Sequence, residues 1–282
     1  MNIIINIIYV VILFIDKFLK ILNKNYFRYR IYQKIRDNFY KINYHGKTIT
    51  FFTPSLSSRR RAESVHYHEP ETIEWIKNFK KTKDSKEIVF WDVGACIGQF
   101  SMLAGLYHKN IKICSFEPST KNLNLLSTNI SINKLNNKII LCPFPLSDES
   151  FAINNMLEKI NEEGKASNQF TMVDEINKKF KYSTIGFSSD FLIKNFILPP
   201  PNYLKIDTDG NEKNIIDGSI DLIRSNHLNE IQIELTENSS DADYCINLLL
   251  ENNFKIIKKF REKKYENVKK HIKLFNFRLK KN

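Results

Sequence analysis

The stretch Trp91-Asp92-Val93-Gly94-Ala95-Cys96-Ile97-Gly98 decides the fold of this 282-residue chain. It closes a short apolar run from Glu87 to Val93 that has the length and composition of a buried strand. It also opens a segment from Gly98 to His108 whose apolar residues recur at helical spacing. Since the chain has only eight glycines, two of them within five residues indicate a tight turn between this strand and this helix.

Strands and helices alternate along the chain around this turn. Further strands are expected at residues 111–116, 138–142, 203–207 and 230–235, with a closing strand pair at 254–260 and 272–279. Further helices are expected at residues 119–133, 211–224 and 242–252. This order predicts an α/β fold with a mostly parallel sheet and helices on both faces. The polar residues 148–182 fit neither period and suggest a floppy or hairpin-like insertion.

The turn after the first strand suits a cationic ligand. Ligands of open α/β sheets bind at the carboxyl ends of strands, near the point where the strand order reverses. Alanine stands where a dinucleotide motif has its middle glycine, and Asp92 precedes Gly94. A carboxylate there would repel the pyrophosphate of a nicotinamide cofactor but would suit the amino group of a methionine-like moiety. An ordinary tight turn is the alternative.

A second carboxylate follows the second expected strand. Glu117 stands before Pro118, about 25 residues after Asp92, which is near the spacing at which an acidic residue reaches a ribose diol. A carboxylate can accept hydrogen bonds from both hydroxyls of the diol. We expect Asp92 and Glu117 to line one cavity and to hold opposite halves of a nucleoside ligand.

These motifs resemble the FkbM family of S-adenosylmethionine-dependent methyltransferases. The similarity covers about residues 68–260 and includes WDVGACIGQFS, SFEPSTKNLNLLSTNISIN, PLSDES, LKIDTDGNEKNIIDG and IQIEL in the expected order. The resemblance implies a class I (Rossmann-like) methyltransferase fold, with seven strands of which the last is antiparallel. It also implies S-adenosyl-L-methionine as the cofactor.

The resemblance further implies which residues contact that cofactor. From the methionine end through the ribose to the adenine ring, they are Asp92, Gly94, Ala95 and Gly98, then Glu117, then Ser147 and Asp148. The chain departs from the family pattern at Asp209, where glutamate is usual, so any role assigned to this shorter carboxylate is weakened.

Carboxylates at the fourth strand are the candidates for the chemistry. A sugar hydroxyl is a poor nucleophile at neutral pH and needs a base to take its proton. We therefore expect Asp207, Asp209 and Glu234 to be catalytic, without a metal. Orientation of the cofactor is the alternative for Asp207, and a divalent cation held by the three carboxylates is a weaker one. The expected reaction is O-methylation of a sugar hydroxyl in a glycan or a secondary metabolite.

The first 42 residues differ from the rest. Residues 3–15 read IIINIIYVVILFI and are followed by a basic stretch. The apolar run is shorter than a spanning helix needs, and it lacks the basic start and cleavage site of a secretory signal. Residues 1–42 are expected to form a helical segment, either an interfacial anchor on an anionic leaflet or a helix docked on the body. Residues 43–282 would form a cytoplasmic methyltransferase domain, on the cytoplasmic face of the membrane if the anchor forms.

Composition and charge exclude several classes. The apolar share of 42% and aromatic share of 12% exclude collagen, a coiled-coil rod and a wholly disordered chain. The net charge of +12 suits an anionic partner or reflects a generally lysine-rich surface. The four cysteines contain no CxxC pair, so we expect reduced thiols rather than disulfides or a zinc site.

Two clusters of basic residues and two other functions remain as alternatives. For the pair His66 and His68 an exposed loop is preferred over a base or metal site, and for Arg59 to Arg61 contact with water alone is preferred over an acidic sugar or a lipid phosphate. A nucleic-acid methyltransferase is disfavoured, because KIDTDG lacks the aromatic element that grips a flipped base. A non-catalytic, membrane-associated module that binds the cofactor is the remaining alternative.

Overall fold

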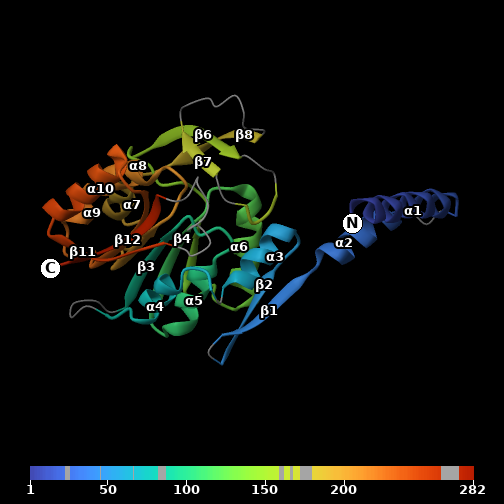
Figure 1. Cartoon of the computed structure of the whole chain (residues 1–282), viewed down its shortest axis with the longest axis horizontal. Helices are drawn as coiled ribbons and strands as arrows, with labels where there is room; N and C mark the ends of the chain where they lie inside the picture. Colours follow the sequence, from blue (N-terminus) through green and yellow to red (C-terminus); the bar gives the residue numbers. More distant parts are fainter. Residues whose placement is uncertain are drawn as a thin grey trace.

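A seven-stranded sheet forms the centre of the computed structural model, with strand order β11-β12-β10-β9-β3-β4-β5 (Figure 1). Neighbours from β10 to β5 are parallel, and β12 is antiparallel to both β10 and β11. This confirms the expected mostly parallel sheet whose last strand is antiparallel. The strands are β3 (Ile88–Val93), β4 (Ile111–Phe116), β5 (Ile139–Cys142), β9 (Tyr203–Ile206), β10 (Glu230–Thr236), β11 (Phe254–Phe260) and β12 (Leu274–Lys281).

The structure describes most of the chain. The described residues are 1–22, 26–44, 46–65, 67–81, 87–158, 162–165, 168–171, 180–261 and 273–282.

Helices cover both faces of the sheet, because successive residues of a strand point to opposite sides. On β3, Phe90 packs in one apolar cluster, whereas Trp91 and Val93 pack in the other. The first cluster includes residues of α4 (Pro70–Lys77), α5 (Gln99–Tyr107) and α6 (Thr120–Ile132). The second includes residues of α7 (Ser189–Lys194), α8 (Glu212–Asp217), α9 (Ile220–Arg224) and α10 (Ser240–Glu251).

The single helix expected over residues 211–224 is two short helices, α8 and α9. The break falls at Gly218, where an added Cβ would lie 2.0 Å from the carbonyl oxygen of Ser147. The Ser219 hydroxyl donates to the carbonyl of Ile215 at 2.6 Å. The turn between the two helices therefore packs directly on the backbone that follows β5.

The expected insertion forms a small antiparallel sheet in the order β7-β6-β8. Its strands are β6 (Ala152–Glu158), β7 (Asn168–Thr171) and β8 (Phe180–Gly186); residues 159–161, 166–167 and 172–179 lie outside the described residues. Glu158 anchors this sheet to the start of α6, since its carboxylate accepts from the hydroxyls of Ser119 at 2.8 Å and Tyr182 at 2.9 Å.

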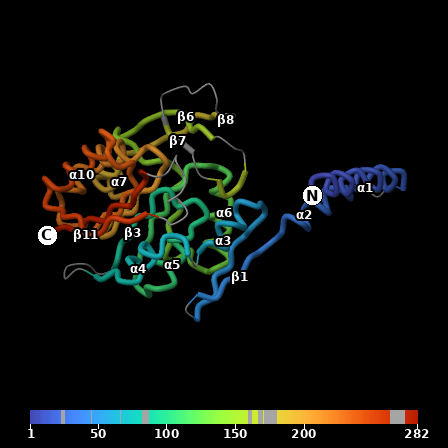
Figure 2. Tube along the Cα trace, in the orientation of Figure 1, coloured from blue at the N-terminus to red at the C-terminus, as the bar shows by residue number. Residues whose placement is uncertain are grey.

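Of the N-terminal elements, the first two helices stand away from the sheet, whereas the hairpin and the third helix pack against the body (Figures 1 and 2). These elements are α1 (Asn2–Ile21), α2 (Phe27–Arg36), the hairpin of β1 (Phe39–Tyr44) and β2 (Lys47–Phe52), and α3 (Leu56–Ser64). The β2 amides of Thr50 and Phe52 donate to the side chains of Asn133 and Asn129, which ties the hairpin to α6. The proposed division at residue 42 falls inside β1.

Strands β3 and β9 are neighbours at the point where the strand order reverses, and their carboxyl ends approach closely. Gly94, just after β3, has φ of 85°, and an added Cβ would lie 1.9 Å from the carbonyl oxygen of Asp207. Only glycine fits this approach, because any side chain would push the two strand ends apart.

Replacing Gly94 by alanine should therefore lower the free energy of unfolding by much more than backbone strain alone would. Gly46 is a matched control, since it has φ of 75° but nothing within 4 Å of an added Cβ. We expect Gly46→Ala to lower the free energy of unfolding by about 1 kcal/mol and Gly94→Ala by about 3 kcal/mol or more. Urea denaturation measures both, and equal losses would contradict the close approach.

Candidate active site

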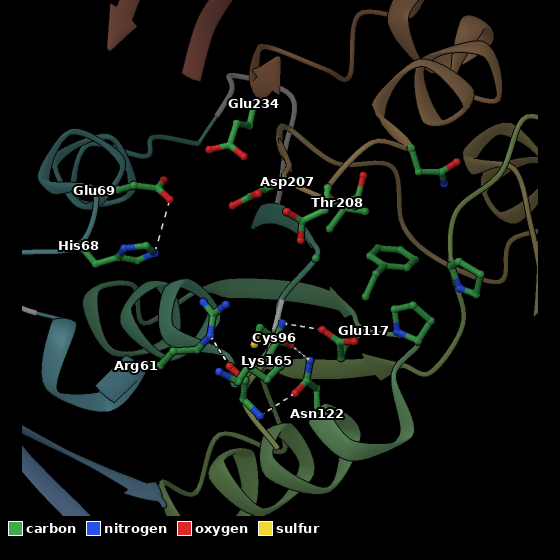
Figure 3. Close-up of a pocket in the computed structure, with 18 of the residues that line it drawn as sticks. Arg61, His68, Glu69, Cys96, Glu117, Asn122, Lys165, Asp207, Thr208 and Glu234 are labelled. Carbon is green, nitrogen blue, oxygen red and sulfur yellow. Dashed lines mark hydrogen bonds and ion pairs between the residues drawn. The ribbon is translucent and has the colours of Figure 1, made fainter. Parts of the chain in front are cut away.

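A cavity of about 640 Å³ opens at the carboxyl edge of the sheet, beside the junction of β3 and β9 (Figure 3). This volume lies within the range of small-molecule sites. Its wall comes from α3 and the segment after it, the turns after β3, β4 and β9, the segment after β5, and parts of β6, β7 and β10. Residues far apart in the sequence therefore face one space.

Glu117 lies at the end of β4 in this wall and is held by backbone amides. Its Oε2 accepts from the amide of Cys96 at 2.9 Å, and its Oε1 accepts from the amide of Ser119 at 2.8 Å. Burial raises the pKa of Glu117 to about 7, although these hydrogen bonds favour the ionised form. The carboxylate is thus fixed in place and titrates near neutral pH.

A buried lysine offsets the negative charge of the carboxylates on the side of the cavity opposite Glu117. Lys205 of β9 is 1% exposed, and its Nζ lies 2.7 Å from Oδ2 of Asp207. Burial would lower the pKa of Lys205, but Asp207, Glu69 and Asp92 outweigh it and raise that pKa. Burial would raise the pKa of Asp207, but the Lys205 ammonium prevails and lowers it. Asp207 is therefore held as an ion pair and is a weak base.

Two further carboxyl groups surround this pair. Burial, followed by the charges of Asp207 and Glu69, raises the pKa of Glu234 to about 10, so Glu234 is protonated at neutral pH. Glu69 is 2% exposed and accepts from the Thr72 hydroxyl at 2.7 Å. Glu69 has a left-handed backbone with φ of 43°, a conformation that is uncommon outside glycine.

His68 lines the cavity next to Glu69. Its Nε2 lies 3.5 Å from Oε1 of Glu69, and its ring stacks on Phe100 at 5.8 Å between centroids. Figure 3 shows His68, Glu69, Glu234 and Asp207 around a common space. The preference for an exposed loop is wrong for His68, because the turn into α4 brings it to the sheet edge; His66 lies outside the described residues.

The loop after β9 is shaped by Glu212, which sequence analysis did not single out for this role. Its Oε1 accepts from the amide and hydroxyl of Thr208 at 3.0 and 2.9 Å, and its Oε2 accepts from the amide of Gly210 at 3.0 Å. These bonds curl the loop so that Asp209, with φ of 57°, stands exposed at the rim of the cavity.

A basic wall, formed by Arg60, Arg61 and Lys165, faces the cavity from α3 and residues 164–165. The Arg61 Nε donates to the carbonyl of Gly164 at 2.6 Å. The preference for contact with water alone is therefore wrong for Arg61, whereas Arg60 is exposed where it lines the cavity, as that preference predicts. The preference is also wrong for Arg59, which lies over the ring of Tyr40 at 4.0 Å.

Asp92 does not belong to the cavity wall, so the expectation that it shares a cavity with Glu117 is wrong. On β3 it points to the same side as Phe90, under α5, where its Oδ2 accepts from the Ser101 hydroxyl at 2.5 Å. Its Oδ1 has no hydrogen-bond partner among the described residues. Burial raises the pKa of Asp92. Across the cavity from Glu117 the carboxylate is that of Asp207.

Four other residues that the resemblance assigns to the cofactor, Ala95, Gly98, Ser147 and Asp148, do not line the cavity. The amide of Ala95 donates to the carbonyl of Phe116 at 2.9 Å, and Gly98 begins α5 with φ of 85°. Ser147 is buried and its amide donates to the carbonyl of Phe187 at 2.9 Å, while Asp148 is exposed. The preceding residues, Pro145 and Leu146, line the cavity instead.

The structure thus brings several predicted residues to one cavity: Gly94, Glu117, Asp207, Asp209 and Glu234. Within the described ranges, no group of three or more His, Cys, Asp or Glu side chains is arranged to hold a metal ion.

Sequence comparison identifies the family. Residues 92–266 match the Methyltransferase FkbM domain. The chain belongs to this family. It is therefore an S-adenosylmethionine-dependent methyltransferase, and its cofactor is S-adenosyl-L-methionine. A search of curated protein sequences finds no match.

Solved structures of methyltransferases are similar at low identity. The FkbM methyltransferase from Methylobacillus flagellatus KT has a TM-score of 0.48 and 16% identity, over 76% of this chain and 50% of that chain. Our chain thus corresponds to about half of that protein. The precorrin-6y C5,15-methyltransferase from Geobacter metallireducens GS-15 has a TM-score of 0.41 and 14% identity, over 75% and 86%. A putative rRNA methylase from Clostridium thermocellum has a TM-score of 0.43 and 10% identity, over 75% and 93%.

The donor set of the cavity fits this cofactor. Glu117 offers a fixed carboxylate to a diol, and Phe116, Pro145 and Leu146 offer apolar surface for a base. At the other side, Gly94 leaves the backbone bare next to Asp207, an anionic neighbour for a cationic ligand.

Removing the buried lysine should destabilise the fold strongly. Lys205→Met leaves Asp207 without its counter-ion, and we expect a loss of about 3 kcal/mol in the free energy of unfolding. Lys213→Met is the control, since Lys213 forms an equally short ion pair with Asp217 but is 39% exposed; we expect a loss below about 1 kcal/mol. Adding Asp207→Asn to Lys205→Met should recover part of the loss. Similar losses for both lysines in urea denaturation would contradict this charge balance.

Proposed function

We propose that this enzyme methylates a hydroxyl oxygen of a sugar-containing acceptor in a glycan or a secondary metabolite. The observation that carries the proposal is the His68–Glu69 pair, which faces the same cavity as Glu117 and lies beside Asp207 and Glu234. A hydroxyl acceptor needs both a base for its proton and polar groups that hold neighbouring hydroxyls.

The cofactor would occupy the part of the cavity next to β3 and β4. Glu117 would accept hydrogen bonds from the ribose hydroxyls, and Leu146 and Phe116 would contact the adenine ring. The backbone at Gly94 and the carboxylate of Asp207 would bind the methionine end. When bound, the cofactor supplies a methyl group activated by its sulfonium.

His68 is the best-placed base in this arrangement. Imidazole is the side chain whose ordinary pKa is closest to neutral, and Glu69 would orient the ring by accepting from it. Asp207 is a weak base because Lys205 lowers its pKa, and Glu234 is protonated because its pKa is about 10. We therefore assign Glu234 to a hydrogen bond with an acceptor hydroxyl, and Asp209 at the rim to the same role, while Asp207 stays with the cofactor.

The basic wall suggests an acceptor that carries an acidic group. Arg60 is exposed at the cavity and has no hydrogen-bond or ion-pair partner among the described residues. A phosphate or carboxylate on the acceptor would supply its counter-ion. A nucleic acid is the alternative acceptor that this wall and the net charge of +12 favour.

Methyl transfer from labelled S-adenosylmethionine tests the acceptor class. We expect label in isolated acidic glycans or their sugar precursors and none in RNA or DNA. Label in nucleic acid, together with binding that weakens steeply with salt, would replace the sugar proposal. Cofactor binding without transfer to any of these acceptors would favour a non-catalytic module.

Cofactor affinity should depend on pH through Glu117. Its pKa of about 7 means that the carboxylate, the form that accepts hydrogen bonds from a diol, predominates only above that pH. We expect calorimetry to show tighter binding of S-adenosylmethionine above pH about 7 than below it. Glu117→Gln should weaken binding about tenfold or more at alkaline pH and remove this dependence. An unchanged pH dependence in the variant would refute the ribose role.

The base assignment is tested by His68→Asn. We expect kcat to fall about 100-fold to 10,000-fold, with the dissociation constant for the cofactor unchanged. His227→Asn, an exposed position away from the cavity, is the matched control and should retain full activity. A His68→Asn enzyme with normal kcat would exclude His68 as the base.

A further inference from the structure

Helix α1 leaves a broad apolar surface uncovered. Asp16 is its one buried residue, whereas Ile3, Ile7 and Phe14 are 75%, 58% and 74% exposed. The helix extends beyond the apolar run of residues 3–15 and, with 20 residues, is long and apolar enough to cross a membrane, judged by length and composition alone, so the expectation that it is too short to span is wrong. The alternative of a helix docked on the globular body does not describe α1, since all of its residues except Asp16 are at least partly exposed and its main packed neighbour is α2.

The few polar residues of α1 form one stripe. Asn2, Asn6, Tyr9, Asp16 and Lys20 follow one another at intervals of three, four or seven residues, so they share one side of the helix, and Lys17, three residues before Lys20, borders the same side. The rest of the circumference is apolar, and we call this surface the apolar arc. Its exposed members are Ile3, Ile4, Ile7, Ile8, Val10, Val11, Phe14, Ile15, Phe18 and Ile21.

The polar stripe is the side that contacts α2. The Oδ1 of Asp16 accepts from the backbone amide of Arg28 at 3.0 Å, and the Nζ of Lys20 lies 4.0 Å from Oδ2 of Asp16. Figures 1 and 2 show α2 running back beside α1 toward the N-terminus. The two helices thus form a hairpin that turns the apolar arc outward.

Helix α2 is basic and aromatic. It carries no acidic residue, and its cationic residues are Arg28, Arg30, Lys34 and Arg36. Tyr29 and Tyr32 are exposed, and the guanidinium groups of Arg28 and Arg36 donate to their hydroxyls at 3.0 and 3.1 Å. Arginine and tyrosine side chains of this kind are typical of the headgroup region of a bilayer.

The hairpin decides between a helix that spans the bilayer and one that lies in its surface. If α1 spanned, α2 beside it would carry Arg28 and Arg30 into the hydrocarbon, where charged side chains are costly. If α1 lies in the plane of the interface, the apolar arc enters the acyl region while α2 stays among the headgroups.

We propose that the α1–α2 hairpin is an in-plane anchor that binds an anionic lipid bilayer. The apolar arc of α1 inserts into the outer part of one leaflet, and Arg28, Arg30 and Lys34 of α2 contact lipid phosphates, while Arg36 stays paired with Glu163 of the body.

Flotation of the full-length protein with lipid vesicles tests this anchor. We expect it to bind vesicles of phosphatidylcholine with phosphatidylglycerol more tightly than vesicles of phosphatidylcholine alone. Val11→Gln with Phe14→Gln should weaken binding to both by about tenfold or more. Arg30→Gln with Lys34→Gln should weaken binding only to the anionic vesicles, by about fivefold per residue. Failure to bind either kind of vesicle would overturn the proposal.

A control variant shows whether vesicle binding depends on the apolar arc or on any exposed apolar side chain. Phe196 is 94% exposed and lies on the body, between α7 and β9. Phe196→Gln should bind vesicles like the unmodified protein. A loss equal to that of the α1 variant would overturn the role of the arc.

Two further measurements exclude other occupants of the arc. In vesicle-bound Asn2→Cys protein, a membrane-impermeant maleimide added outside should label the new thiol, whereas a spanning helix would protect it. Sedimentation without lipid should give the same oligomeric state for the unmodified and Val11→Gln/Phe14→Gln proteins. A protected thiol, or an oligomer that the α1 variant dissociates, would contradict the in-plane anchor.

Discussion

The close approach of Gly94 to the carbonyl of Asp207 is the constraint on which the site depends. It lets β3 and β9 run side by side to their ends, at the point where the chain changes direction across the sheet. The turns that follow diverge from there, and the cavity opens between them. Glu117 reaches it from β4 and Glu234 from β10, so the topology gathers carboxyl groups from separate strands into one space.

This cluster of carboxyl groups is stable because the buried ammonium of Lys205 offsets part of its negative charge. One buried ammonium faces Asp207, Glu69 and Asp92, and the remaining excess of charge is removed by holding Glu234 protonated. The result is a site with a fixed anion, neutral hydrogen-bond donors and an imidazole close together. Arg60, Arg61 and Lys165 close the opposite wall with positive charge, so the two sides of the cavity differ in the groups they would bind.

The local sequence pattern predicted most strands of the sheet, because a buried apolar strand followed by a glycine-containing turn can be recognised in the sequence. It placed Gly94 and Glu117 correctly at the cavity. It misplaced Asp92, although strand alternation could have indicated that this residue shares the side of Phe90 under α5. It undervalued His68 and Arg61, since their position depends on how the segment before β3 folds over the sheet edge, and that is tertiary structure. The break at Gly218 likewise depends on contact with the distant Ser147 backbone.

The central claim is that one cavity at the β3–β9 junction binds the cofactor, with Glu117 on the ribose. A crystal structure of the full-length protein with S-adenosylhomocysteine measures this directly. We expect the ribose hydroxyls within hydrogen-bond distance of the Glu117 carboxylate and the amino-acid end between Gly94 and Asp207. Density for the ligand in another cavity, or with its ribose away from Glu117, would contradict the account.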